Sequence, residues 1–216
     1  MAQELGLEQR VSALESLLMH FTRNGNNVRI TGANLHIRNG LGTTETTNSL
    51  GNLIVGCNEP RGEEENIRTG SHNVVVGQAH NFSRFGGIVV GQHSTISGDF
   101  ASVSGGNDNT ASGDYSAVSG GNHNTASGNW SSISGGVFNI ASGGTSSISG
   151  GADHMASGGS SSISGGSFNT ASDLWSSVSG GRGNTASGAV ASVSGGEDRT
   201  AAGESDWVAG SLFQDQ

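Results

Sequence analysis

A strict repeat with a 15-residue period is the feature that most constrains how this chain folds. The letters SVSGG at 102–106 return as AVSGG at 117–121 and as SISGG at 132–136, while NTASG at 109–113 returns at 124–128. A β-solenoid stacks one coil of chain on the next and buries such a repeated position in one continuous core. The repeat therefore predicts a buried column of branched residues: Ile88, Val103, Val118, Ile133, Ile148, Ile163, Val178, Val193 and Val208.

A second column indicates that each coil holds two extended pieces. It consists of Ile96, Ala111, Ala126, Ala141, Ala156, Ala171, Ala186 and Ala201. Neighbours in an extended piece point to opposite faces, so an inward Val103 places Ser102 and Ser104 outside. The chain has 38 glycines and only 32% hydrophobic residues, a composition more typical of disorder. A disordered chain has no reason to keep two columns in register, and we therefore expect an all-β parallel solenoid.

The roll is expected to span residues 51–216 and to begin with shorter coils. NLIVG at 52–56, NVVVG at 73–77 and IVVG at 88–91 are related by a 14-residue step, the first lengthened by a seven-residue insertion around Pro60. The insertion carries dense charge, so it is predicted to be an exposed loop. At the other end, Trp207 and Phe213 replace small residues and are expected to cap the last coil.

Residues 1–24 are predicted to form a coiled-coil helix. Between Glu4 and Phe21, apolar residues follow heptad a and d spacing at Leu7, Val11, Leu14, Leu18 and Phe21, which are the expected trimerisation residues. Packing of the helix on its own chain is the alternative. Residues 25–50 are expected to form a β neck with two short strands, 28–30 and 35–37, after a helix end at residues 24–27.

Two features favour a homotrimer. One column of Val or Ile and one of Ala make a thin core in a single chain. Association of chains along the roll would bury additional apolar surface and so stabilise it. The SVSGG and NTASG motifs, and NLIVG more closely, resemble the head repeats of trimeric autotransporter adhesins. That resemblance implies left-handed parallel β-rolls in three chains side by side. The chain departs from the family in its 15-residue period and in a coiled coil that precedes the head.

The same resemblance bears on localisation. No signal peptide and no membrane anchor is visible in the sequence, so autotransport is not carried over. We expect a bacterial or phage fibre or appendage component that is extracellular, on the cell surface or on a virion.

Several function classes are disfavoured by the sequence. No Gly-x-Ser-x-Gly, Walker or dinucleotide motif occurs, and the seven histidines do not pair with Cys or carboxylates at metal-ligand spacing. We therefore expect no enzyme activity, metal or cofactor. The net charge of −9 disfavours nucleic acid, and no apolar run approaches the ~20 residues of a membrane helix. The single cysteine, Cys57, is expected to be a buried small residue.

One irregular column is the candidate ligand surface. Phe85, Phe100, Tyr115, Trp130 and Trp175 share a repeat position that smaller residues fill in other coils, and Phe138 and Phe168 add aromatic rings elsewhere. An inward column would be more uniform, so Tyr115, Trp130, Phe138, Phe168 and Trp175 are expected on the surface or at a chain interface. We hypothesise an adhesin-like fibre that binds a glycan or protein. The alternative is an ice-binding solenoid that uses Ser and Thr columns.

Overall fold

The structure is a computed structural model that describes residues 6–62 and 65–210. The chain divides into two compact units, Met1–Ile37 and Arg38–Gln216, which are described separately.

The first unit contains one helix among its described residues, α1 (Leu7–Leu18), which is shorter than the sequence predicts. Four of the five expected seam residues lie on it, and Leu7, Val11, Leu14 and Leu18 are all exposed. Phe21 is not part of the helix, because the chain enters a strand there, so its place in the seam was wrong. The helix therefore presents its apolar stripe without a covering from its own chain in the described residues.

A two-stranded hairpin follows the helix. β1 (Phe21–Asn24) pairs antiparallel with β2 (Asn27–Ile30), which leaves Gly25 and Asn26 as the loop. Gly25 has φ 58°, and glycine adopts this left-handed conformation without the steric cost that a side chain brings. The predicted partner strand at 35–37 was wrong, because residues 24–27 form this turn instead of ending the helix.

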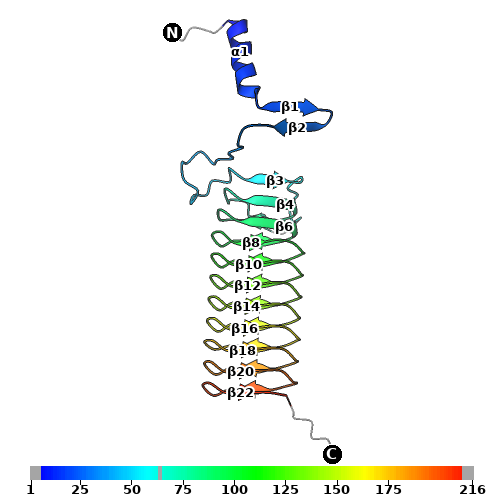
Figure 1. Ribbon diagram of the computed structural model, residues 1–216, viewed down its shortest axis with the longest axis vertical. Coiled ribbons are helices and arrows are strands. Elements are labelled where there is room, and N and C mark those ends of the chain that lie inside the picture. Colours follow the sequence, from blue (N-terminus) through cyan, green and yellow to red (C-terminus); the bar gives the residue numbers. More distant parts are fainter. Residues whose placement is uncertain (1–5, 63–64, 211–216) are drawn as a thin grey trace, which may run out of the picture. The chain divides into compact units, whose positions relative to one another are not determined.

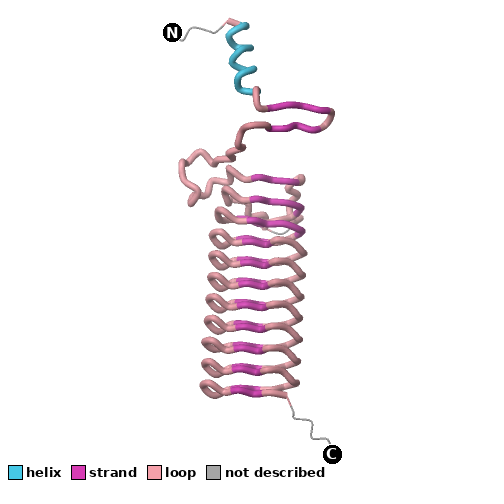
Figure 2. The backbone as a smooth tube through the Cα atoms, viewed as in Figure 1, coloured by secondary structure: helices cyan, strands magenta, loops and turns pink. Residues whose placement is uncertain are grey.

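The second unit is a parallel β-solenoid built from two sheets. Figures 1 and 2 show the strands of the first sheet stacked in chain order from β3 to β22. The first sheet has 11 strands among the described residues, stacked in chain order: β3 (Leu53–Val55), β4 (Val74–Gln78), β6 (Ile88–Gln92), β8 (Ser102–Val103), β10 (Ala117–Val118), β12 (Ser132–Ile133), β14 (Ser147–Ile148), β16 (Ser162–Ile163), β18 (Ser177–Val178), β20 (Ser192–Val193) and β22 (Trp207–Val208).

The second sheet stacks nine described strands in the same way: β5 (Asn81–Phe82), β7 (Thr95–Ile96), β9 (Thr110–Ala111), β11 (Thr125–Ala126), β13 (Ile140–Ala141), β15 (Met155–Ala156), β17 (Thr170–Ala171), β19 (Thr185–Ala186) and β21 (Thr200–Ala201). Successive coils pair in parallel at a constant 15-residue offset from β8 onward, as in Val118 with Ile133. The predicted parallel solenoid with 15-residue coils is confirmed.

The core lies between the two sheets. Val103, Ile133 and Val193 are at most 1% exposed, and so are the other branched residues of the column from Val118 to Val178. The alanines of the second sheet face them and are fully buried. Val208, in the last strand, is only partly buried because no described coil covers it.

Ile88 does not belong to the core column. It pairs with the outward Ser102 and is exposed, whereas Val89 pairs with Val103 and is fully buried. The prediction for Ile88 was wrong by one residue because the repeat period lengthens from 14 to 15 residues between this coil and the next. The pairing of Val89 with Val103 still follows the 14-residue period, but the pairing of Gln92 with Asn107 follows the 15-residue one. The extra residue therefore enters within the Gly105–Gly106 turn, after the strand, and not before it.

The insertion between the first two coils is anchored to the roll. β3 pairs with β4 across a 21-residue step. Arg61 donates a hydrogen bond from Nε to the carbonyl oxygen of Ala79 at 2.8 Å, and one from Nη2 to Thr95 Oγ1 at 2.9 Å. Arg68 Nη1 donates to the carbonyl oxygen of Asn58 at 2.6 Å. The two guanidinium groups thus donate to the backbone carbonyl oxygens of Ala79 and Asn58 and to the Thr95 hydroxyl, and Arg61 ties the insertion to the neighbouring coils.

The last described coil is not closed by Trp207. This residue pairs with the outward Ser192, is exposed, and donates a hydrogen bond from Nε1 to Ser194 Oγ at 2.8 Å. It therefore lies on the outer face of the first sheet and not over the core. Phe213, the other residue of the predicted cap, lies outside the described residues.

A ladder of buried asparagines runs through the roll at one end of the second-sheet strands. Its regular members are Asn109, Asn124, Asn139, Asn169 and Asn184, all fully buried. In each coil the amide donates to two glycine carbonyls, as Asn124 does to Gly120 at 3.1 Å and to Gly136 at 2.9 Å. The amide oxygen accepts the N–H of the next ladder residue, so that every polar atom of the side chain is paired.

His154 interrupts this ladder. Its Nδ1 accepts the N–H of Asn169 at 3.1 Å, so the ring is neutral with its proton on Nε2. Nε2 is buried and has no hydrogen-bond partner among the described residues. Burial lowers the pKa of His154 below its ordinary value of 6.5, although neighbouring backbone groups and Asp153 oppose this effect.

We expect His154→Asn to stabilise the protein, more so in acid. The restored amide satisfies the ladder, which is worth about 1–2 kcal/mol. The folded-state pKa of His154 lies below the unfolded value, so the unfolded chain binds the extra proton and wild-type stability falls as pH drops below 6.5. Melting temperatures at pH 5 and pH 8 test this, with the exposed His123→Asn as control. An equal gain at both pH values would contradict the titration argument.

Candidate ligand-binding surfaces

The corners of the coils carry side chains in an unusual backbone conformation. At the corner before each first-sheet strand from β8 to β22, one residue has φ between 56° and 60°; this first corner column consists of Phe100, Tyr115, Trp130, Thr145, Ser160, Trp175, Val190 and Ser205. The left-handed region costs a residue with a side chain roughly 1–2 kcal/mol relative to its usual conformations. Not one member of the column is glycine, so side chains are kept where glycine would relieve the strain.

A second corner column lies before the second-sheet strands. Its residues also have positive φ and comprise His93, Asp108, His123, Phe138, Asp153, Phe168, Gly183 and Asp198. The structure therefore separates the expected aromatic residues into two groups. Tyr115, Trp130 and Trp175 belong to the first corner column, whereas Phe138 and Phe168 belong to the second. All five are at least half exposed.

Aromatic rings of the first corner column stack on one another. Phe100 and Tyr115 have ring centroids 5.2 Å apart with planes 16° from parallel, and Tyr115 and Trp130 are 5.5 Å apart at 7°. Phe85 meets Phe100 edge-on at 5.3 Å and is buried. Exposure then rises along the stack to 50% at Tyr115 and 60% at Trp130. The stack thus begins at the buried Phe85 and is most exposed to solvent at Trp130.

Polar side chains accompany the stack one residue earlier in each coil. Asp99 forms an ion pair with Arg84, whose Nε lies 2.6 Å from Asp99 Oδ1. Asp114 Oδ1 accepts the N–H of Asp99 at 2.9 Å, and Asn129 Oδ1 accepts the N–H of Asp114 at 3.1 Å. These bonds fix the side chains beside the rings, so rings and polar groups alternate along a single edge of the roll.

The second corner column brings together ionisable residues that were not predicted as a group from the sequence. Asp108 lies between two histidines, with Oδ1 3.7 Å from His93 Nδ1 and Oδ2 3.9 Å from His123 Nε2. His123 also contacts Phe138, with ring centroids 4.8 Å apart. The signal was present in the sequence, because residues 93, 108 and 123 are separated by the 15-residue period. Among the described residues, no cluster of three or more His, Cys, Asp or Glu side chains is arranged to hold a metal ion.

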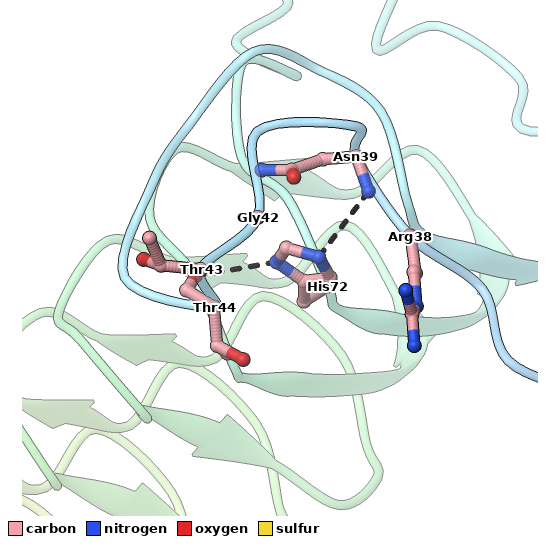
Figure 3. A pocket seen from close by; sticks show the side chains of 6 residues that line it. All are labelled: Arg38, Asn39, Gly42, Thr43, Thr44 and His72. Atoms are coloured by element: carbon pink, nitrogen blue, oxygen red, sulfur yellow. Dashed lines mark hydrogen bonds between the residues drawn. The ribbon is translucent and has the colours of Figure 1, made fainter.

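A small polar pocket lies where the chain enters the roll (Figure 3). It has a volume of about 260 Å³ and is lined by Arg38, Asn39, Gly42, Thr43, Thr44 and His72. His72 joins its two sides, since Nε2 accepts the N–H of Asn39 at 3.3 Å while Nδ1 lies 3.2 Å from the carbonyl oxygen of Thr44. The histidine therefore holds the loop against the first coils.

A second, shallower pocket of about 430 Å³ lies beside the turns of the first coils, lined by Gly56, Cys57, Glu59, Gly77, Gln78, Gly91 and Gln92. Cys57 is exposed there, so its expected burial was wrong. The local reason is that Cys57 follows β3 in the chain and belongs to the irregular insertion instead of a strand.

The outer face of the first three strands is apolar. The residues of this outer patch are Leu53, Val55, Val74, Val76, Ile88 and Val90. They alternate with Val75 and Val89, which are buried, and with Ile54, which is 39% exposed in the first strand. All six are exposed or half-exposed. Parallel strands that are apolar on both faces are typical of sheets covered on both faces. From β8 to β20 the same outward positions hold Ser and Ala, so the patch is confined to the first coils.

Comparison of the sequence with models of protein families gives no match, and comparison with curated proteins gives none either. None of the helices among the described residues is long and apolar enough to cross a lipid bilayer.

Proposed function

We propose that the protein is a non-enzymatic, adhesin-like structural solenoid that associates as a homotrimer and presents its corner residues to a glycan or protein. The observation that carries the proposal is the outer patch on β3, β4 and β6. Six apolar side chains on one face need a cover, and an identical chain supplies it most economically because the same patch is present on each copy. The exposed seam of α1, which includes Leu14, adds a second surface of the same kind.

The constant core and the variable corners support the binding role. From β8 onward the core positions hold Val, Ile or Ala in every coil, while the two corner columns range from Ser and Asp to Trp. Side chains with positive φ are costly to fold and are over-represented at functional sites. The roll thus serves as a rigid frame on which exposed residues are held at fixed spacing, as in other repeat proteins with extended binding surfaces.

The association is tested by replacing one outer-patch residue with a charge. We expect the wild-type protein to have a mass about three times the chain mass of 21.7 kDa by light scattering. Ile88→Asp places a charge in the covered patch and is expected to yield a monomeric species with an unchanged circular dichroism spectrum. Ser102→Asp is the matched control, because Ser102 occupies the same outward column one coil further on. A monomeric wild type would overturn the homotrimer.

Ice binding is a second candidate, favoured by one regular surface. An outward column of the first sheet holds serine in seven successive coils, at residues 104, 119, 134, 149, 164, 179 and 194. The corresponding threonine column of the second sheet is interrupted by Ile140 and Met155, which weakens the match to a lattice. Thermal hysteresis in dilute solution tests this function, and its absence would remove it.

A further inference from the structure

We propose that the stacked rings of Tyr115 and Trp130, with Asp114 and Asn129 beside them, form a binding site for a neutral saccharide chain that runs along the roll. This inference rests on the proposed binding function and names its site and ligand class.

The geometry of the rings suits a sugar. Parallel rings with centroids 5.5 Å apart are offset, because carbon atoms in contact lie ~3.5–4 Å apart, so part of each ring face stays open. A pyranose presents a face of C–H groups that packs on such an aromatic surface. The chain of sugar rings in an extended polysaccharide advances by nearly the spacing of stacked strands, ~4.8 Å, so that successive sugars would meet successive coils.

Hydrogen-bonding groups for sugar hydroxyls lie beside both rings. Asn129 uses Oδ1 to accept the N–H of Asp114, and Asp114 uses Oδ1 to accept the N–H of Asp99. Both of these hydrogen bonds use Oδ1 and leave Asn129 Nδ2 and Asp114 Oδ2 outside them, and Tyr115, which carries a phenolic hydroxyl, is 50% exposed. A donor and an acceptor are thus held next to the rings by backbone contacts, which reduces the entropy that a ligand must overcome.

Charge selects a neutral ligand over an anionic one. The cation beside the stack is Arg84, which is already paired with Asp99 through two hydrogen bonds of 2.6 and 2.9 Å and lies over the Phe85 ring. Asp114 lies close enough to contribute, with Asp99, to the raised pKa of Arg84, so two carboxylates share this one cation, and the whole chain carries a net charge of −9. An acidic polysaccharide would be repelled.

The irregular sequence of the column argues against its being a contact between copies that runs the length of the roll. A contact that runs the length of the roll would repeat one residue type in each coil, as the core does. After Trp130 the column continues with Thr145 and Ser160, whose hydroxyl oxygens lie 2.8 Å apart, and returns to an aromatic residue only at Trp175. The aromatic stack is therefore a local site of a few coils, rooted at Phe85.

The test is retardation of the native full-length protein in gels that contain a soluble polysaccharide. The neutral probes are mixed-linkage β-glucan, hydroxyethyl cellulose, galactomannan and dextran, with polygalacturonate as the acidic comparison. Trp130→Gly is the informative variant, because glycine suits φ 56° and the coil is expected to fold with a melting temperature close to that of wild type. Trp207→Ala is the matched control, since Trp207 is a similarly exposed tryptophan in a different coil, away from the stack.

We expect at least one neutral probe to retard the wild type and the Trp207→Ala variant equally, and Trp130→Gly to weaken that affinity at least tenfold. Tyr115→Ala is expected to act in the same direction. Equal retardation of Trp130→Gly and wild type, retardation by polygalacturonate alone, or none by any probe would overturn the saccharide site. Light scattering separates the two proposals: a mass lowered by Trp130→Gly would assign the stack to association, whereas a monomer that binds β-glucan would keep the site and remove the trimer.

Discussion

Replacing Ile133 with aspartate is expected to lower the free energy of unfolding by about 4 kcal/mol or more. Ile133 is 1% exposed and lies between Val118 and Ile148 in the stacked column of the first sheet. A carboxylate there would lose its hydration and meet only hydrocarbon from the coils on both sides. The damage is also expected to spread, because each coil of a solenoid is stabilised by its neighbours.

Chemical denaturation followed by circular dichroism measures this effect. The matched control is Ser134→Asp, since Ser134 is the next residue along the chain and points outward. We expect the control to unfold within about 0.5 kcal/mol of wild type. A loss of stability in the control that equals the loss in Ile133→Asp would show that the faces of the strand are assigned the wrong way round.

Replacing Gly121 with alanine is expected to cost about 3 kcal/mol or more, by two effects that add. Gly121 has φ 89°, a conformation that residues with a side chain rarely adopt. A Cβ at this position would overlap the carbonyl oxygen of Gly136 in the next coil and lie 2.9 Å from its nitrogen. Both atoms belong to the backbone, so neither yields without breaking the stacking of the coils.

The preceding residue is the natural comparison. A Cβ on Gly120 would meet no atom within 4 Å, and its φ is not in the left-handed region. We therefore expect Gly120→Ala to be neutral or to stabilise by up to about 1 kcal/mol through the unfolded chain. Thermal unfolding of the two single variants measures the contrast. Similar melting temperatures for the two would contradict the close approach of the coils at Gly121.

The repetitive part of the fold could be predicted because one residue type recurs at each buried position. Val103 and Ala111 each have a counterpart in the next coil, and an alternating strand then fixes which neighbours face solvent. The boundary between the two periods could not be located by the same argument. Ile88 and Val89 are both apolar, and only the pairing of strands shows that the extra residue enters in the Gly105–Gly106 turn.

The candidate site was predictable in composition and not in geometry. The aromatic column follows from the 15-residue spacing of Phe100, Tyr115 and Trp130, but their left-handed backbone does not, because bulky residues rarely adopt it. Asparagine adopts that conformation more readily than most residues, yet the ladder asparagines do not adopt it. Instead, the preceding residue does so, for example Asp108 before Asn109, and the asparagine turns inward. The regularly spaced asparagines therefore form a buried hydrogen-bonded ladder, although asparagine is also a residue typical of turns.

The surface that we propose for self-association also leaves a signal in the sequence. The LIV, VVV and IVV strands indicate burial on both faces, yet in a single chain the outward side chains of all three strands remain exposed or half-exposed. The apolar composition of these strands predicts that both faces are buried, but it does not identify what covers the outer face. A covering copy of the same chain adds no further residues to the sequence from which it could be recognised.

The asparagine ladder has a consequence for how such a protein changes over generations. Each side-chain amide oxygen accepts the backbone N–H of the ladder residue in the next coil, as Asn109 does from Asn124 and Asn124 does from Asn139. Duplication or loss of a complete 15-residue unit therefore preserves each pairing on both sides of the junction. Length thus varies in steps of one strand spacing, ~4.8 Å. A coil that is copied brings its two corner residues with it, so the reach of the molecule and the order of its surface groups change in a single genetic event.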